Sequence, residues 1–300
     1  MHYDIIVIGG SYAGMAATLQ LIRARRMVLV IDAGELRNRF ASHSHGFLGQ
    51  DGIDPGEITA HARRQLEAYP TLSWREDRAE TISGQADNFT VTTADGKSYQ
   101  GRRILLAIGV TDQLPPIAGL AERWGKSVFH CPYCHGYELN QGHIGIIATG
   151  PMSVHQAELL TDWGSVTLVV NQALTLDLST RTSLESRGVA IEDTPIDRIE
   201  NSADVLLADR RLLSFKGLFI ASRSTPSSQI AEIAGCALEE TPMGIQIRTN
   251  AEGQTSVPGI FACGDTAMAP HSVSLAVGNG AMAGAQVHRS LLWPEGTLKL

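Results

Sequence analysis

The chain has 300 residues, of which 43% are hydrophobic and 18% charged, and its formal net charge is -7. This composition excludes a disordered polyelectrolyte and leaves enough apolar material for two domains. The acidic balance argues against a nucleic-acid partner, because binding to a phosphate backbone depends on clustered Lys and Arg. Apolar runs are too short for a membrane-spanning helix, and the N-terminus lacks the features of a signal peptide. We therefore expect no membrane partner and a cytoplasmic location.

The first predicted elements are two apolar strands joined by a glycine turn and a helix. The first strand is Asp4 to Ile8, and it is followed by the turn GGSYAG, residues 9–14. Small residues with helical character come next, and the second strand, Met27 to Ile31, ends at Asp32. This order of strand, glycine turn, helix, strand and acid is that of a dinucleotide-binding βαβ unit.

The spacing of the turn residues supports the same interpretation. The dinucleotide fingerprint has glycine at the first, third and sixth positions of the turn, and Gly9 and Gly14 fit it. Ser11 replaces the middle glycine, which is a mild change because the side chain is small and its hydroxyl can bond a phosphate. Asp32 stands where an acid accepts hydrogen bonds from a ribose. We favour this site over a tight turn that binds nothing.

Further along the chain, turn residues mark a hairpin and two linkers. Residues 89–93 and 97–100 read as strands on either side of a turn that contains glycine. Asp112 to Gly119 and Glu239 to Gly244 contain prolines, and we interpret them as linkers. No short-period repeat or low-complexity tract is present.

The most informative stretch lies in the middle of the chain and contains a CxxC motif. Cys131 and Cys134 are two residues apart, and they can close and reopen a small disulfide ring. The neighbouring imidazoles of His130 and His135 can lower a thiol pKa or carry protons. A zinc site needs further ligands, and no second CxxC or suitable His pair is present. We favour redox chemistry over zinc binding and over two inert buried cysteines, and we expect no metal.

A second βαβ pattern follows the CxxC. Gly145 to Ala148 reads as a strand, a helix runs to Trp163, and Ser165 to Val170 is the next strand. Near the end of the chain, a short strand runs into Cys263-Gly264-Asp265, and a helix rich in Gly and Ala spans 276–285. An acid between a strand and such a helix suits a helix terminus that packs tightly on a ligand or a neighbour.

Together these motifs resemble the low-molecular-weight thioredoxin reductases, a family of flavoproteins. The resemblance rests on GGSYAG at 9–14, Asp32, ILLAIG at 104–109, CPYCHG at 131–136 and TSVPGIFACGD at 255–265. It implies an α/β fold of two Rossmann-like domains, the second inserted in the first. The implied limits are 1–112 plus 244–300 for an FAD-binding domain and 113–243 for an NAD(P)H-binding-like domain that carries the CxxC.

The resemblance also implies roles for individual residues. Asp265 would bond the ribityl–phosphate chain of FAD, and Val273 would lie close to the isoalloxazine. Cys134 would be the thiol beside the flavin, and Cys131 would exchange with the outside thiol or disulfide. The implied cofactor residues are Gly9, Ser11, Ala13, Gly14, Asp32, Gly109, Asp265 and Val273. A homodimer, and a small dithiol, a small disulfide or a thioredoxin-like protein as the substrate, are implied in the same way.

The sequence departs from the reductase pattern in the second βαβ unit and beside the dithiol. In the NADPH turn, Ala148 stands at the position of the first glycine and Ser153 at that of the third small residue. Asn171-Gln172 stands where the family has a histidine followed by arginines. His135 replaces an acid after the second cysteine, and we expect it to transfer protons for the dithiol. Lone histidines are more often surface residues or hydrogen-bonded core residues, so we treat His43 and His45 only as minor candidates for the lining of the site.

These departures resemble a CxxCHG subgroup that includes dithiol oxidases of the gliotoxin and holomycin type. The expected activity is FAD-dependent thiol–disulfide exchange, and its direction stays open. A reductase would take electrons from NADPH or NADH, whereas an oxidase would pass them from a dithiol to oxygen. A third possibility is a flavin-binding sensor without turnover, against which the intact CxxC argues.

Overall fold

The computed structural model describes residues 2–293, and in it the chain forms two compact units. The first unit consists of residues up to Arg37, Pro55–Thr111 and the chain from Ser224 onward. The second consists of Asn38–Asp54 and Asp112–Arg223. Among residues 2–293, no helix is long and apolar enough to cross a membrane.

The first unit is built on a sheet whose central strands are parallel. The strand order is β3-β2-β1-β6-β5-β4, and β19 pairs with β6. The strands β1, β2, β3, β6 and β19 are parallel, whereas β5 pairs antiparallel with β4 and β6. The bounds are β1 His2–Ile8, β2 Val28–Asp32, β3 Leu72–Glu76, β4 Ala79–Gln85, β5 Asn88–Thr93, β6 Ser98–Leu106 and β19 Ile260–Ala262.

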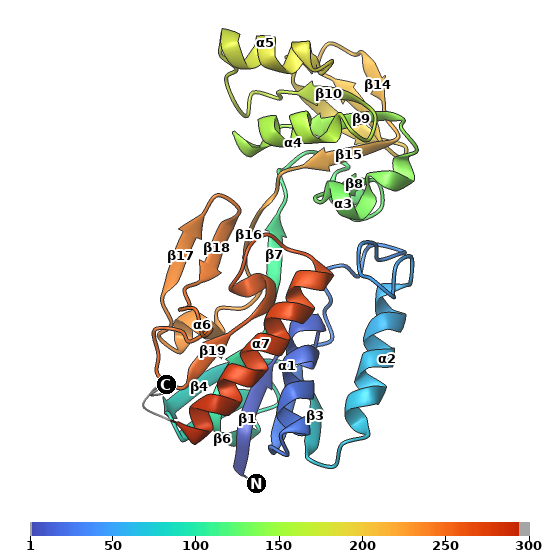
Figure 1. The fold of residues 1–300 in the computed structure, drawn as a ribbon. Helices are drawn as coiled ribbons and strands as arrows, with labels where there is room; N and C mark the ends of the chain where they lie inside the picture. Colours follow the sequence, from blue (N-terminus) through green and yellow to red (C-terminus); the bar gives the residue numbers. More distant parts are fainter. Residues whose placement is uncertain (1, 294–300) are drawn as a thin grey trace. The chain divides into compact units, whose positions relative to one another are not determined.

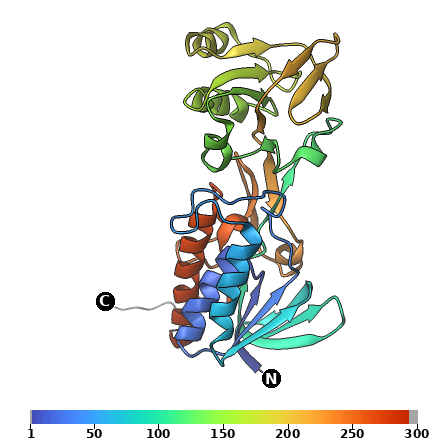
Figure 2. The same cartoon turned by 90° about the vertical axis from the view of Figure 1, so that its right-hand side faces the viewer.

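Helices cover this sheet, and Figure 2 shows α1, α2 and α7 on one of its faces. Helices α1 and α7 lie side by side along their length (Figure 1). The bounds of the helices are α1 Tyr12–Arg23, α2 Pro55–Glu67, α6 Ile230–Ile233, the short turn η3 Gly264–Thr266 and α7 Val273–Leu292. Residues 5–8 of β1 are buried on both faces of the sheet, and their sequence is a continuous apolar run, as in other parallel sheets.

A smaller sheet has the order β17-β18-β16-β7, and the chain passes from one unit to the other within β7 and β16. Its strands are β7 Val110–Gln113, β16 Arg223–Pro226, β17 Leu238–Thr241 and β18 Gly244–Ile247. The linker expected at Glu239 to Gly244 is wrong: β17 and β18 pair antiparallel there, and Pro242 lies in the turn between them. A proline in a hairpin turn and a proline in a linker give the same local signal.

The second unit repeats the βαβ principle. Its main sheet is parallel, in the order β11-β10-β9-β15-β8, and a separate antiparallel sheet has the order β12-β13-β14. The strands are β8 Val128–Phe129, β9 His143–Ile147, β10 Ser165–Val169, β11 Ala190–Glu192, β12 Ile196–Glu200, β13 Asp204–Leu207, β14 Leu212–Ser214 and β15 Gly217–Ile220. The helices are η1 Ala121–Arg123, α3 Pro132–His135, η2 Tyr137–Leu139, α4 Met152–Leu160 and α5 Leu178–Ser186.

The predicted α/β class with two Rossmann-like folds is confirmed. The predicted domain limits, 1–112 plus 244–300 and 113–243, concern cofactor domains and stay a prediction. Compactness divides the chain differently at two places, since residues 224–243 belong to the first unit and 38–54 to the second. No pattern in the sequence indicates that residues 38–54 pack with the second unit, because they lie between two elements of the first unit.

Candidate active site

The turn after β1 packs so closely that two of its positions have no room for a side chain. Gly9 has a φ of 103°, and a Cβ there would collide with the carbonyl oxygen of Ala107 at the end of β6. A Cβ at Gly14 would collide with the carbonyl oxygen of Gly9. Both glycines are therefore needed for the close approach of the turn, helix α1 and the neighbouring strand.

The N-terminus of α1 offers backbone donors to an anion. Ser11 is the N-cap residue, its side chain does not cap the helix, and the first turn contains no acidic residue. The first amides of a helix have no partners within it and carry partial positive charge, so they suit a phosphate group. Ala13, in the same turn, is buried against η3, where a Cβ on Gly264 would come within 2.6 Å of the Ala13 Cβ.

Asp32 binds the glycine turn from the end of β2. Its Oδ1 accepts a hydrogen bond from the backbone N–H of Gly10 at 2.9 Å. A carboxylate can accept several hydrogen bonds, so this contact is compatible with a ribose acceptor. A Cβ on Gly10 would lie 2.5 Å from the ring of Trp74 in β3. Sequence reasoning missed Gly10 and Trp74, since only the fold brings β3 to the turn.

Asp265 is held in η3 by contacts from two distant segments. Its Oδ2 lies 2.9 Å from Nη1 of Arg37, a residue 228 positions away. The preceding residue, Gly264, has a φ of 72° and donates its N–H to Oδ1 of Asn279 in α7 at 2.7 Å. Nothing in the sequence singled out Arg37, which places a cation beside the predicted flavin contact.

The remaining predicted cofactor residues lie at the ends of elements in the same unit. Gly109 follows β6 with a φ of 67°, and open space surrounds the place of its missing Cβ. It is therefore needed for its backbone conformation and not for space. Val273 is the first residue of α7, where the Oγ of Ser272 caps the helix by accepting the N–H of Leu275 at 3.1 Å.

All of the predicted cofactor residues thus belong to the first unit. The closely packed turn, the uncapped N-terminus of α1 and the carboxylate at the end of β2 form a donor and acceptor set that fits FAD. In this set the amides would hold the pyrophosphate, and Asp32 would hold a ribose.

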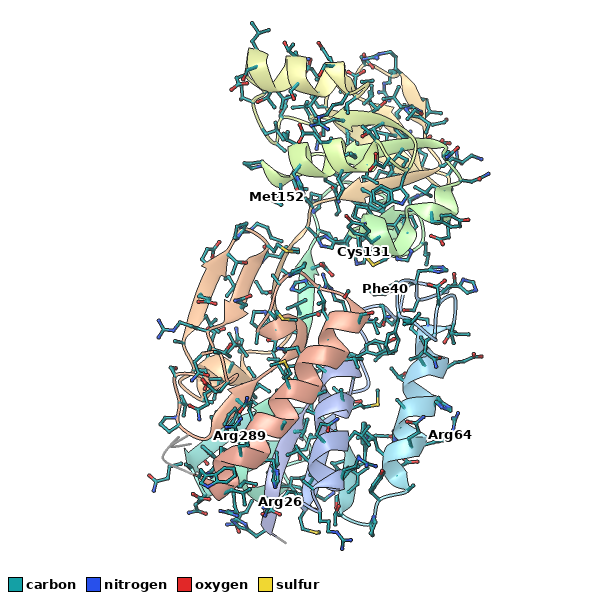
Figure 3. The ribbon with its side chains drawn as sticks, viewed as in Figure 1. Arg26, Phe40, Arg64, Cys131, Met152 and Arg289 are labelled. Atoms are coloured by element: carbon teal, nitrogen blue, oxygen red, sulfur yellow. A yellow bond between two sulfur atoms is a disulfide. The ribbon has the colours of Figure 1, made fainter. Side chains whose placement is uncertain are left out.

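The second unit carries the redox pair, and Cys131 and Cys134 form a disulfide with their Cα atoms 5.3 Å apart (Figure 3). Cys131 is the N-cap residue of α3, and Pro132 starts the helix, a position for which proline is well suited. From α4, Nε2 of Gln156 donates to the carbonyl oxygen of His130 at 2.9 Å. The segment that leads into the disulfide is therefore anchored to a regular helix.

The glycine of the CPYCHG motif is required by a tryptophan. Gly136 has an ordinary φ of -71°, but a Cβ there would lie 2.6 Å from Cδ1 of Trp163. The same indole meets the ring of Tyr133 edge-on, with ring centroids 5.3 Å apart. Trp163 thus supports the helix that carries both cysteines, and sequence reasoning did not find this role.

His135 directly follows Cys134 in the chain and is held by an aromatic contact. Its ring stacks on Phe129 at 4.4 Å with an interplanar angle of 23°. Burial lowers the pKa of His135 to about 4, while the Glu138 carboxylate opposes this shift and His45 adds to it. At neutral pH the imidazole is therefore uncharged and able to accept a proton.

The other flanking histidine takes part in a different contact. Nδ1 of His130 lies 3.2 Å from Oγ of Ser222, which donates to Oδ1 of Asp112 at 3.0 Å. Within residues 2–293 no group of His, Cys, Asp and Glu side chains could hold a metal ion. Cys236 and Cys263 are buried and free, and burial raises the pKa of Cys263 to about 12, which makes that thiol unreactive.

Comparison with known proteins places these features in a family. The profile of the pyridine nucleotide-disulphide oxidoreductases matches residues 3–280. Thioredoxin reductase tcpT from Claviceps purpurea is 31% identical over 96% of this chain and 94% of its own length. Thioredoxin reductase aclD from Aspergillus oryzae is 28% identical over 98% of both chains.

Solved structures agree with this result. An oxidoreductase from Agrobacterium tumefaciens superposes with a TM-score of 0.96 and 55% identity, over 98% of this chain and all of the other. The structure of HlmI gives a TM-score of 0.89 and 32% identity over 97% of this chain and 93% of its own. The chain belongs to the pyridine nucleotide-disulphide oxidoreductase family and is an FAD-dependent thiol–disulfide oxidoreductase similar to thioredoxin reductases.

Proposed function

We propose that the chain oxidises a small dithiol to a disulfide and delivers the electrons through FAD to oxygen. The observation that carries this direction of electron flow is the state of the second dinucleotide-type turn. In the second unit, Oγ of Ser153 accepts the backbone N–H of Thr149 at 3.0 Å, and the Thr149 hydroxyl donates to the carbonyl oxygen of Ala221 at 2.8 Å. A turn amide that would face a pyrophosphate is thus already bonded within the chain.

The end of β10 supports the same conclusion. Oδ1 of Asn171 accepts the N–H of Ile196 at 2.9 Å, so this side chain braces a loop. Arg181, the nearest arginine after β10, pairs with Asp193 at 2.8 Å. A 2′-phosphate would have to compete with this carboxylate for the guanidinium, and we expect poor use of NADPH and little preference for it over NADH.

The proposed residue roles follow from the local geometry and from the family resemblance. A substrate thiolate attacks the sulfur of Cys131, the disulfide breaks, and Cys134 leaves as a thiolate. The second substrate thiolate then displaces Cys131, which releases the oxidised product and leaves the enzyme as a dithiol. His135 accepts the proton of the attacking thiol and returns it to a leaving sulfur. Bound FAD supplies the two-electron acceptor that oxygen reoxidises with release of hydrogen peroxide.

The surroundings of the disulfide favour a small substrate with an apolar body. Tyr133 and Tyr137, on either side of Cys134 in the chain, are 70% and 86% exposed. Exposed aromatic side chains give contact area to an apolar molecule at a low cost in conformational entropy. A thioredoxin-like protein is the competing substrate, and the two are distinguished by the rates at which each, in its reduced form, bleaches the flavin.

The deciding experiment is anaerobic mixing of the oxidised holoenzyme with NADPH, NADH and dithiothreitol in turn. We expect rapid loss of flavin absorbance with the dithiol alone and, when air is admitted, formation of one hydrogen peroxide for each dithiol oxidised. Cys131→Ser and Cys134→Ser should each keep bound FAD and lose this bleaching. Rapid bleaching by either nicotinamide would identify a reductase and overturn the proposed direction.

A further inference from the structure

The segment 38–54 contributes a histidine to the surroundings of the redox pair. Although its neighbours in the chain belong to the first unit, this segment packs with the second. It is closed on itself by the N–H of Ser44, which donates to the carbonyl oxygen of Ile53 at 2.8 Å. Within it, Oδ1 of Asp51 accepts the N–H of Gly46 at 2.8 Å. These bonds give His45 a defined backbone position.

Both ring nitrogens of His45 face carboxylate oxygens. Nε2 lies 3.5 Å from Oε1 of Glu138 in η2, and Nδ1 lies 3.4 Å from Oδ1 of Asp51. The His45 side chain is 21% exposed, whereas that of Glu138 is 41% exposed. The ring is therefore fixed between the two carboxylates, and it restrains Glu138, which solvent alone would leave mobile.

Glu138, three positions after His135 in the chain, acts on that residue through its charge. Among the charges that shift the pKa of His135, the Glu138 carboxylate is the larger and raises it, while His45 is the smaller and lowers it. His43 is the other titratable group near His45, with ring centroids 6.3 Å apart. His135 also stacks on the uncharged ring of Phe129.

We propose that His45 is a positioning residue of the redox centre, which holds the Glu138 carboxylate where it stabilises the protonated form of His135. The inference rests on the proposed function, in which His135 accepts the proton of the attacking thiol. A negative charge close to a histidine base favours the imidazolium that forms when the base accepts a proton. Here the carboxylate is itself held by a histidine from a segment distant in sequence.

The proposal predicts the direction in which the pKa of His135 changes when His45 is replaced. If His45 acts by holding Glu138, then His45→Ala lets the carboxylate move away and lowers the pKa of His135. If His45 acts only by its direct electrostatic effect on His135, which lowers the pKa of His135, the same substitution raises that pKa. Glu138→Gln should lower the pKa under either mechanism. We expect each downward change to weaken proton binding at His135 about threefold, as for an exposed ion pair.

The test is a titration of the histidine ring signals by NMR in the oxidised holoenzyme, with His135 assigned from His135→Gln. We expect the pKa of His135 to be lower in Glu138→Gln and in His45→Ala. It should not be lower in His45→Gln, which keeps a hydrogen-bond donor for Glu138. His43→Ala is the matched control, since His43 lies in the same segment and is exposed. An upward shift or no shift in His45→Ala overturns the proposal.

The titration must reach acid pH, where a variant can unfold, so a second measurement is made at pH 6. Reduction of the flavin by dithiothreitol at pH 6 should be slower in His45→Ala than in the wild type by up to about threefold, because a weaker base accepts the proton of the attacking thiol less readily. Equal rates would count against the proposal. Wild-type dithiol turnover in His135→Gln would remove the role of His135 from the proposed function, while the NMR shifts would still report the contact of His45 with Glu138.

Discussion

His135 is the titratable side chain whose state most affects the redox chemistry proposed here. Burial against Phe129 lowers its pKa to about 4, so it is a neutral base over the physiological range. We expect His135→Gln to slow reduction of the flavin by dithiol about a hundredfold at pH 7, the size of a typical general-base effect. This ratio between wild type and variant should persist to about pH 5 and fall toward one below pH 4, as the wild-type ring becomes protonated. Stopped-flow absorbance of the flavin measures it, and a constant ratio across this range would argue against a base.

The same pKa has a consequence for stability. An unfolded histidine binds a proton near pH 6.5, whereas His135 in the folded chain does so only at about 4. Between these values the unfolded state binds more protons, so the free energy of unfolding decreases as the pH falls and levels off below pH 4. The full loss is about 3 kcal/mol. Urea unfolding of wild type and His135→Gln at pH 7 and pH 4 should show this extra loss in the wild type alone.

At the residue scale, prediction from sequence worked where the chemistry is local. The CxxC and His135 lie within five positions of one another, and they come together in α3. Arg37 was not found and His45 was only a minor candidate, because their partners, Asp265 and Glu138, are far away in the sequence. Isolated histidines and arginines are mostly surface residues, so only the fold distinguishes these two from the others.

At the scale of elements, the packing of α7 on α1 depends on particular glycines. A Cβ on Gly280 would collide with the carbonyl oxygen of Ala13, and one on Gly284 would lie 2.5 Å from that of Ala17. These obstacles are backbone atoms, which cannot move aside as a flexible side chain could. The sequence predicted tight packing for this Gly- and Ala-rich helix, and the structure identifies α1 as the neighbour.

We expect Gly280→Ala to push α7 away from α1 and to lower the free energy of unfolding by about 1–3 kcal/mol. FAD should also be released more readily, because α1 and the adjoining η3 carry predicted cofactor residues. Gly278→Ala is a matched control in the same helix, since no atom lies within 4 Å of its added Cβ. This control should be stabilised by up to about 1 kcal/mol through helix propensity. Thermal unfolding and flavin retention after gel filtration measure both variants, and equal behaviour would refute the packing argument.

At the scale of the whole molecule, the sequence predicted two Rossmann-like folds because each has a complete strand–turn–helix–strand pattern. The linker predicted at Glu239–Gly244 is a hairpin turn around Pro242, whereas the predicted limits of the cofactor domains stay predictions. The predicted FAD-binding domain includes 38–54, which compactness groups with the second unit, because contiguity in sequence is the only guide where no periodic pattern exists. The cytoplasmic location and the homodimer stay predictions.

Each unit has hydrophobic cores of its own. Among residues 2–293, the clusters around Val7 and Ile104 contain side chains of the first unit only. Those around Ile146 and Leu218 contain side chains of the second unit only. Because the predicted FAD residues all lie in the first unit, binding energy from FAD should stabilise that unit and leave local stability in the second unchanged.

Removal of FAD therefore provides a test at this scale. At free FAD one hundred times its dissociation constant, bound cofactor adds about 2.7 kcal/mol to the stability of the unit that binds it. Hydrogen exchange followed by mass spectrometry should show faster exchange in β1 and β6 of the apoprotein and unchanged exchange in β9 and β15. Readdition of FAD should restore the protection of β1 and β6, which controls for irreversible damage. An equal loss of protection in all four strands would mean that the two units unfold as one, and that the cores do not set the limits of cooperativity.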